Sequence, residues 1–125
     1  MGADLAAPVE VRLSLALLGP LSARLAGEDL NLGGRRQRAV VALLALARGR
    51  QVSTSALLDA LWEGEPPPSG AASLQSYVSH LRRALEPHRP ARAPSRVLVS
   101  RGDGYALAAG AVEVDAWRFE RLVSQ

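Results

Sequence analysis

The sequence predicts an α+β domain that begins with a small antiparallel sheet, continues with three helices and ends near a β-hairpin. Residues 11–17 alternate apolar and polar side chains, which is the period of a half-buried strand. Three segments, 35–47, 53–62 and 71–86, repeat apolar side chains three and four positions apart, which is helical spacing. Residues 97–108 hold two short β-prone segments on either side of a glycine-containing turn. A length of 125 residues suits one compact domain.

The N-terminal sheet is predicted to contain three strands. The alternation over 11–17 defines the first strand, and Gly19-Pro20 ends it because these two residues favour a turn. The second strand is predicted over 21–25, followed by a turn at 27–29 and a short third strand at 30–32. Two consecutive glycines then end the sheet.

Two helices are predicted to follow the sheet. The first spans 35–47, and its buried stripe is expected to be Val40, Leu43, Leu44 and Ala47. The second spans 53–62, with Ser53 or Thr54 as its N-cap. Its inward side chains are expected to be Leu57, Leu58, Leu61 and Trp62. Three prolines exclude a helix in the next segment, 63–70.

The third helix is predicted over 71–86, with a buried stripe of Leu74, Val78, Leu81 and Leu85. A Pro- and Arg-rich connector, residues 87–96, leads to a hairpin of strands 97–100 and 105–108, whose turn glycines supply positive φ angles. Asp115 is expected to cap a short amphipathic helix. This order of helices followed by a hairpin is that of a helix-turn-helix with a wing.

Positive charge is concentrated in the middle of the chain. Residues 33–101 hold eleven arginines and four carboxylates, a net charge of +7, whereas the whole chain carries +3. A basic block of this kind favours a polyanionic partner. The alternative is a solvated face in a protein from an arginine-rich proteome.

The third helix carries polar side chains without a carboxylate on the side opposite its buried stripe. These are Ser73, Ser76, Tyr77, His80 and Arg83, with Ser79 and Arg82 beside them. A solvated helix face commonly mixes both signs of charge. Hydroxyl, imidazole and guanidinium groups donate hydrogen bonds to base edges and phosphates. The pattern therefore indicates a DNA-reading helix, and an ordinary surface helix is the alternative.

Four further arginines fit a nucleic-acid partner. Arg35, Arg36 and Arg38 lie in the first turn of the first helix, where the helix dipole disfavours cations. A bound phosphate would explain why three arginines stand at this position. The alternative is that they are simply solvated. Arg101 lies at the tip of the hairpin, where a guanidinium suits entry into a minor groove. A solvated turn arginine is again the alternative.

Other classes of function find little support in the sequence. The absence of cysteine excludes disulfides, thiolate catalysis and cysteine-ligated zinc. The carboxylates Asp59, Glu63 and Glu65 fit a solvated loop edge better than a catalytic site, and no phosphate-binding loop motif occurs. We therefore expect no enzyme, metal or cofactor. No apolar run approaches the ~18 residues that cross a bilayer, and no signal peptide is recognisable, so we expect a cytoplasmic protein without a membrane partner.

A resemblance to a known family rests on five stretches: RLSLALLGPL, GGRRQRAVVALLALARGRQVS, LLDALWEGEPPPSGAASLQSYVSHLRRAL, RGDGYAL and VDAWRFERLV. They cover nearly the whole chain from residue 11 onward. The sequence resembles the OmpR/PhoB-type winged-helix DNA-binding domain and, more narrowly, the Streptomyces antibiotic regulatory proteins of the AfsR-like family. The resemblance implies a sequence-specific transcriptional activator, with secondary-metabolite genes as its expected targets.

The resemblance also implies roles for single residues. The third helix would lie in the major groove, with the polar residues listed above facing it, and Arg101 would be the wing arginine that touches the minor groove. His80 departs from the family, in which Arg is frequent, and an imidazole is shorter and usually neutral. The proline loop would contact RNA polymerase through Glu63, Glu65, Pro66, Pro67 and Pro68. Two copies are expected head to tail on direct repeats of double-stranded DNA, ~10 bp apart.

By the same resemblance, residues 1–10 are expected to be a flexible N-terminus, 11–109 the winged-helix domain and 110–125 the beginning of a helical activation domain. The alternative function is a winged-helix module that binds a protein instead of specific DNA. The apolar side of the last helix, with Trp117 and Phe119, would suit such a partner. Salt dependence separates the two, because binding through arginine–phosphate contacts weakens steeply with salt.

Overall fold

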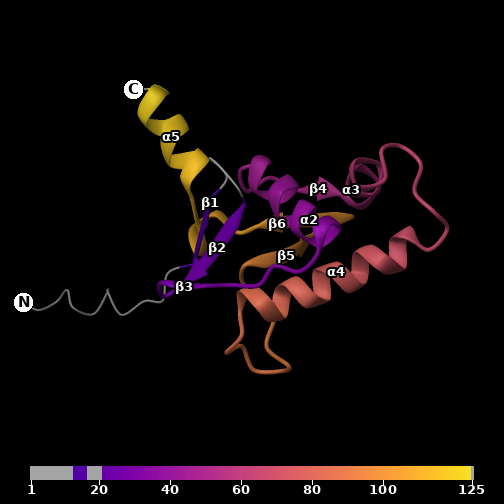
Figure 1. Cartoon of the computed structure of the whole chain (residues 1–125), viewed down its shortest axis with the longest axis horizontal. Helices are drawn as coiled ribbons and strands as arrows, with labels where there is room; N and C mark the ends of the chain where they lie inside the picture. Colours follow the sequence, from indigo (N-terminus) through magenta and orange to yellow (C-terminus); the bar gives the residue numbers. More distant parts are fainter. Residues whose placement is uncertain (1–12, 17–20, 125) are drawn as a thin grey trace, which may run out of the picture.

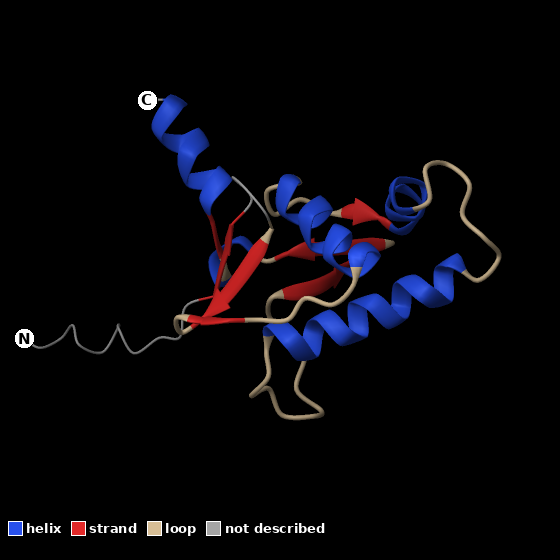
Figure 2. Ribbon diagram, viewed as in Figure 1, coloured by secondary structure: helices blue, strands red, loops and turns tan. Residues whose placement is uncertain are grey.

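Two small sheets and the helices beside them make up the protein in the computed structural model, which describes residues 13–16 and 21–124 (Figure 1). The N-terminal sheet lies at one end of the molecule, and the second sheet, α3(Thr54–Leu61) and α4(Gly70–Leu85) lie toward the other (Figure 2). The α+β winged helix-turn-helix expected from the sequence is confirmed. The segment 1–10, expected to be flexible, lies outside the described residues.

The N-terminal sheet has the strand order β3(Glu28–Asp29)-β2(Ser22–Leu25)-β1(Leu13–Ala16)-β7(Glu113–Val114). β1, β2 and β3 pair antiparallel, with Leu13 opposite Leu25 and Leu25 opposite Glu28. The two residues between β2 and β3, Ala26 and Gly27, have φ angles of 54° and 85°. Positive φ at both positions is what a tight type I′ hairpin turn requires. The third strand therefore lies at 28–29 and not at 30–32, because the turn is shorter than predicted.

β7 was not predicted, because a strand of two residues carries no periodic signal. It pairs parallel to β1, with Leu15 opposite Val114. The chain thus returns to the N-terminal sheet after the hairpin. The fourth strand brings the C-terminal segment onto the sheet at its β1 edge.

α2(Arg35–Leu46) and α3(Thr54–Leu61) agree closely with the predicted helices. α2 buries Val40, Val41, Leu44 and Ala45, while Leu43 and Ala47 are half-buried, so its inward face is turned by about one residue from the expected stripe. Ser53 is the N-cap of α3, and its hydroxyl accepts a hydrogen bond from the Ala56 N–H at 3.1 Å. Leu57 and Leu61 are buried, and Leu58 and Trp62 are half-buried.

The second sheet has the order β4(Val52–Ser53)-β6(Gly104–Leu107)-β5(Leu98–Arg101). The β5–β6 hairpin is the predicted wing, and its turn is Gly102-Asp103, with φ +60° at Gly102. β4 was not predicted; it joins α2 to α3 and pairs antiparallel with β6. A Cβ at Gly104 would lie 2.0 Å from the Val52 carbonyl oxygen, so this close pairing requires glycine.

α5(Asp115–Ser124) is the predicted C-terminal helix, and it follows a short 3₁₀ turn, η2(Ala109–Ala111). Its Trp117 is 8% exposed and donates a hydrogen bond from Nε1 to the Ala45 carbonyl oxygen at 2.6 Å. Trp117 thus packs into the protein's own core. Leu122 and Val123 are exposed, and the side chain of Phe119 is not described.

Candidate nucleic-acid interface

α4(Gly70–Leu85) is the third predicted helix, and its buried stripe is the predicted one. Leu74, Val78, Leu81 and Leu85 are each at most 2% exposed. They fix the rotation of the helix, so that the outward positions are Ala71, Ala72, Gln75, Ser76, Ser79, His80 and Arg83. This outward face is polar, cationic and free of carboxylates. We call these seven residues the exposed face of α4.

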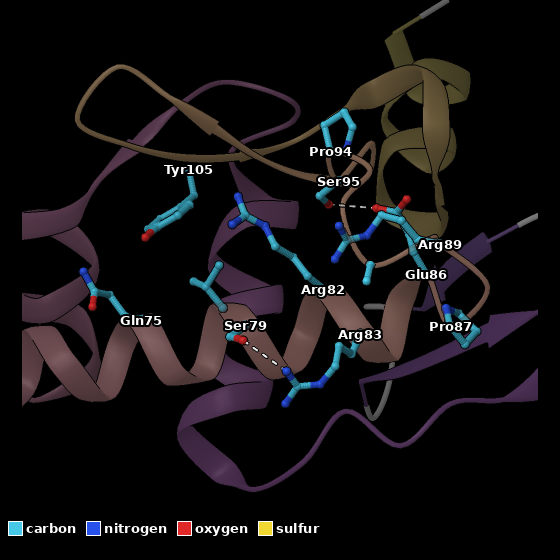
Figure 3. Close-up of a pocket in the computed structure, with 12 residues that line it drawn as sticks. Gln75, Ser79, Arg82, Arg83, Glu86, Pro87, Arg89, Pro94, Ser95 and Tyr105 are labelled. Atoms are coloured by element: carbon cyan, nitrogen blue, oxygen red, sulfur yellow. Dashed lines mark hydrogen bonds between the residues drawn. The ribbon is translucent and has the colours of Figure 1, made fainter.

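Ser76, Ser79, His80 and Arg83 of the predicted DNA-reading residues lie on this exposed face. Arg83 donates a hydrogen bond from Nη1 to the Ser79 hydroxyl, at 3.3 Å, one helical turn away (Figure 3). This contact holds the guanidinium along the helix surface. The small side chains at 71, 72 and 76 leave room for close approach to a groove floor.

Ser73 and Tyr77 are half-buried and lie off the centre of this face. Tyr77 packs against the core and lines a pocket with Arg35 and Glu63. Helix geometry explains the position of Tyr77, because about 100° per residue places it within about 70° of the buried stripe. Gln75 is exposed, although it was not among the predicted DNA-reading residues. An amide that can pair bidentately with adenine was thereby missed.

Arg82 is turned away from the exposed face and toward the wing (Figure 3). It donates from Nε to the Leu98 carbonyl oxygen at 2.9 Å and from Nη2 to the Ser100 hydroxyl at 3.0 Å. Its guanidinium carbon lies 5.7 Å from the centre of the Tyr105 ring, a cation–π distance. Arg82 therefore joins the helix to both strands of the wing. A direct contact of Arg82 with DNA stays a prediction.

The wing tip is attached to the segment that joins α2 to α3. The Thr54 N–H and hydroxyl both donate to the Asp103 carbonyl oxygen, at 3.0 and 2.8 Å. Gln51 donates to the Asp103 carboxylate at 2.5 Å. Arg101 is exposed beside this tip, and its Nη1 donates to the Gly49 carbonyl oxygen at 3.3 Å. The wing is thus held in a fixed position relative to the helices.

The three arginines at the start of α2 differ in their contacts. Arg35 is exposed. Arg36 is also exposed; it donates from Nε to the Leu61 carbonyl oxygen at 3.4 Å and lies 4.8 Å from the centre of the Trp62 ring. Arg38 is half-buried and donates to the Leu21 carbonyl oxygen. Arg35 is the best placed of them for a phosphate, because the other two already brace the fold.

The loop between α3 and α4 presents the predicted polymerase-contact residues to solvent. Glu63, Glu65, Pro66 and Pro68 are exposed, and Pro67 is half-buried. Glu63 adopts a positive φ of 55°, and the Gly64 N–H donates to the Asp59 carbonyl oxygen at 2.8 Å, which ends α3 as a Schellman motif does. The Gly70 N–H donates to the Pro67 carbonyl oxygen at 2.8 Å. The loop is therefore held at both of its ends.

Glu86 ends α4 and fixes the connector that follows. Its Oε2 accepts hydrogen bonds from the Ser95 hydroxyl and from the backbone N–H groups of Arg96 and Val97, at 2.8, 2.8 and 3.0 Å. Burial raises the pKa of the Glu86 carboxyl, but these bonds and the nearby Arg89 guanidinium outweigh it, so the pKa lies below its usual value. The charged carboxylate is therefore the form that holds the connector. No pattern in the sequence predicts this role of Glu86.

An open groove lies where α4, the connector and the wing meet (Figure 3). Ser79 and Arg83 line it from the helix, Arg89 and Ser95 from the connector, and Tyr105 from β6. We call it the connector groove. In the described residues no group of three or more His, Asp or Glu side chains is placed to bind a metal ion, and no helix there is long and apolar enough to cross a membrane.

The fold and this interface define a class of protein. A helix with a polar, cationic exposed face lies beside a β-hairpin that carries an exposed arginine, and both rest on one core. These are the two parts with which a winged helix reads the major and the minor groove. The chain is a winged-helix DNA-binding domain.

The family follows from the comparison of sequences. The family model described as "Transcriptional regulatory protein, C terminal" matches residues 27–107, well over half of the chain, and the chain belongs to this OmpR/PhoB-type family. It is 48% identical over 79 residues to the transcriptional regulatory protein EmbR of Mycobacterium tuberculosis. It is 41% identical over 105 residues to the regulatory protein AfsR of Streptomyces coelicolor and 34% identical over 116 residues to DnrI of Streptomyces peucetius. These relatives are regulators of the Streptomyces antibiotic regulatory protein type, so the resemblance seen in the sequence is confirmed.

These matches cover 63%, 82% and 90% of this chain but only 20%, 10% and 43% of EmbR, AfsR and DnrI. Solved structures agree with the fold. EmbR of Mycobacterium tuberculosis, in complex with a phosphopeptide, superposes with a TM-score of 0.72 and 40% identity, over 82% of this chain and 27% of that one. The DNA-binding domain of RstA from Klebsiella pneumoniae, in complex with the RstA box, superposes with a TM-score of 0.54 and 26% identity, over 70% of this chain and 83% of that one.

Proposed function

We propose that this domain binds direct repeats in promoter DNA and activates transcription, with α4 in the major groove and Arg101 of the wing in the adjacent minor groove. The observation that carries the proposal is the exposed face of α4, which offers Gln75, Ser79, His80 and Arg83 without a carboxylate. Amide and guanidinium groups pair with base edges, and hydroxyls reach bases or phosphates. The RstA DNA-binding domain, which has a related fold, has been solved in complex with the RstA box.

Two copies bound head to tail would place their α4 helices about one helical turn, ~10 bp, apart on the same face of the duplex. Arg35 at the start of α2 would neutralise a backbone phosphate. The chain is related to AfsR and DnrI, which are regulatory proteins of Streptomyces. This relationship supports the proposal that secondary-metabolite genes are the targets.

The test begins with selection of binding sites from a library of random duplexes. The selected duplex and a scrambled one are then titrated with the protein at several salt concentrations. We expect a preference for the selected duplex, two copies of one motif in it, and a linear fall of log affinity with log salt. Equal and salt-insensitive binding to both duplexes would refute the proposal and favour the protein-interaction alternative.

The acidic loop between α3 and α4 is proposed to contact RNA polymerase. Glu63 and Glu65 are exposed on a loop that is held at both ends, so they offer negative charge in a fixed place. The double substitution Glu63→Gln and Glu65→Gln should leave DNA affinity unchanged and reduce transcription from a promoter that carries the selected site. An equal loss of DNA binding and transcription would show that the loop serves only the fold.

A further inference from the structure

The connector between α4 and the wing is a basic surface that has no part in the proposed function described above. Residues 87–96 carry His88, Arg89, Arg92 and Arg96 and contain no carboxylate. The side chains of His88, Arg92 and Arg96 are exposed, and Arg89 is half-buried. The connector is also the only covalent link from the proposed major-groove helix to the proposed minor-groove wing.

Several contacts hold the connector in one shape. The Glu86 carboxylate binds its far end through Ser95 and Arg96, as described above. The Arg89 N–H donates to the Glu86 carbonyl oxygen at 3.1 Å, and Arg89 Nη1 donates to the Ala93 carbonyl oxygen at 2.5 Å. Prolines at 87, 90 and 94 fix further φ angles. A surface that is already ordered loses less conformational entropy when it binds a partner.

The connector lies beside the exposed face of α4. It forms one wall of the connector groove through Arg89 and Ser95, and α4 forms the opposite wall through Ser79 and Arg83 (Figure 3). In the view of Figure 1 it hangs below the C-terminal end of α4, whereas α2 and α3 lie above this helix. The connector thus projects away from the core.

The size of the major groove decides what this surface meets on DNA. A helix with its side chains is about 10–12 Å across, and the groove is about 12 Å wide. When α4 fills the groove, a loop that stands beside the helix reaches the sugar-phosphate strand at the rim. Guanidinium groups bind phosphate oxygens through paired hydrogen bonds.

We propose that the connector is a further DNA-binding element, in which Arg92 and Arg96 bind backbone phosphates at the rim of the major groove. Arg89 is engaged with Ala93 and shapes the loop. The inference rests on the proposed binding of α4 to DNA. The connector would add affinity for DNA without a preference for sequence, because phosphates are the same at every base.

The test measures the salt dependence of binding for the wild-type chain and for the double variant Arg92→Ala/Arg96→Ala, on the selected and the scrambled duplex. We expect the slope of log affinity against log salt to fall in magnitude by about one for each arginine removed, equally on both duplexes. The double variant Arg92→Lys/Arg96→Lys should retain the slope, because an ammonium group also neutralises phosphate. Arg24→Ala, which removes one positive charge, is the control for the single variant Arg92→Ala, since Arg24 lies on β2 and pairs with Asp29 at 3.0 Å.

An unchanged slope in the double alanine variant would overturn the inference, and so would a loss that lysine does not restore. A loss of transcription with unchanged DNA binding would assign the connector to a protein partner instead. Failure of the wild-type chain to show salt-dependent binding would refute the proposed function itself, which keeps the two outcomes apart. Thermal unfolding of each variant checks the fold, and Arg92→Ala alone, at the middle of the connector, serves as a milder second variant.

Discussion

Two neighbouring arginines on α4 point in different directions, because successive residues are about 100° apart around the helix axis. Arg83 is exposed and reaches along the surface to Ser79. Arg82 is half-buried and holds the wing through Leu98 and Ser100. Single substitutions of these two arginines can therefore separate the proposed base recognition from the attachment of the wing.

Arg83→Ala should weaken binding to the selected duplex by about 1–3 kcal/mol and relax the preference for one base position, because a guanidinium that pairs with a base edge is lost. The unfolding free energy should change by less than about 0.5 kcal/mol, as is usual at exposed positions. Titration of duplexes with single base changes measures the preference. An unaltered base preference in this variant would remove Arg83 from the reading residues.

Arg82→Ala should instead lower the unfolding free energy by about 1.5–3 kcal/mol, because hydrogen bonds from a charged donor to the wing disappear. Urea unfolding of this variant beside Arg83→Ala gives the comparison. DNA affinity should fall on selected and scrambled duplexes alike, since a displaced wing costs contacts of every kind. A stable variant that loses only base preference would mean that Arg82 reads DNA, as the sequence suggested.

At the scale of elements, the sequence predicted long periodic segments well and short ones poorly. The buried stripe of α4 follows from four apolar residues at helical spacing. β4 and β7 have two residues each and are strands only because β6 and β1 lie beside them. Tyr77 was expected on the outward face and is half-buried, whereas Gln75 was not named and is exposed. The hydrogen bonds that Glu86 accepts come from residues nine to eleven positions further along the chain. They depend on the shape of the connector, which no local sequence pattern reveals.

The end of α4 is an element whose stability depends on pH. The Glu86 carboxyl has a lowered pKa in the folded state, so the stability it contributes is present above its unfolded pKa and is lost as pH falls through the folded pKa. Glu86→Gln should therefore cost unfolding free energy near pH ~7 and cost much less near pH ~3. Urea unfolding at the two pH values checks this. A cost that is equal at both would show that the charge of the carboxylate is irrelevant.

At the scale of the whole molecule, the arginines of the basic block fall into two groups, those exposed to solvent and those that hold other segments. Arg35, Arg83, Arg92 and Arg96 point charge outward. Arg36, Arg38 and Arg82 bind carbonyl oxygens of other segments and tie α2 and α4 to their neighbours. The net positive charge of residues 33–101 agrees with the class of protein, a DNA-binding domain. The contacts in the structure are needed to show which arginines are exposed and available to bind DNA.

The extent of the folded unit is decided by α5. Division of the chain at residue 109 stays a prediction, yet Trp117 is 8% exposed and its Nε1 donates to Ala45 of α2. If α5 folds with the winged helix, Trp117→Ala should lower the unfolding free energy by about 3–5 kcal/mol, as loss of a large buried aromatic does. Leu122→Ala on the same helix is the matched control, and at 61% exposure it should change stability by less than about 0.5 kcal/mol. Calorimetry of both variants gives the answer: near-equal unfolding temperatures would place α5 outside the cooperative unit and support the boundary at 109.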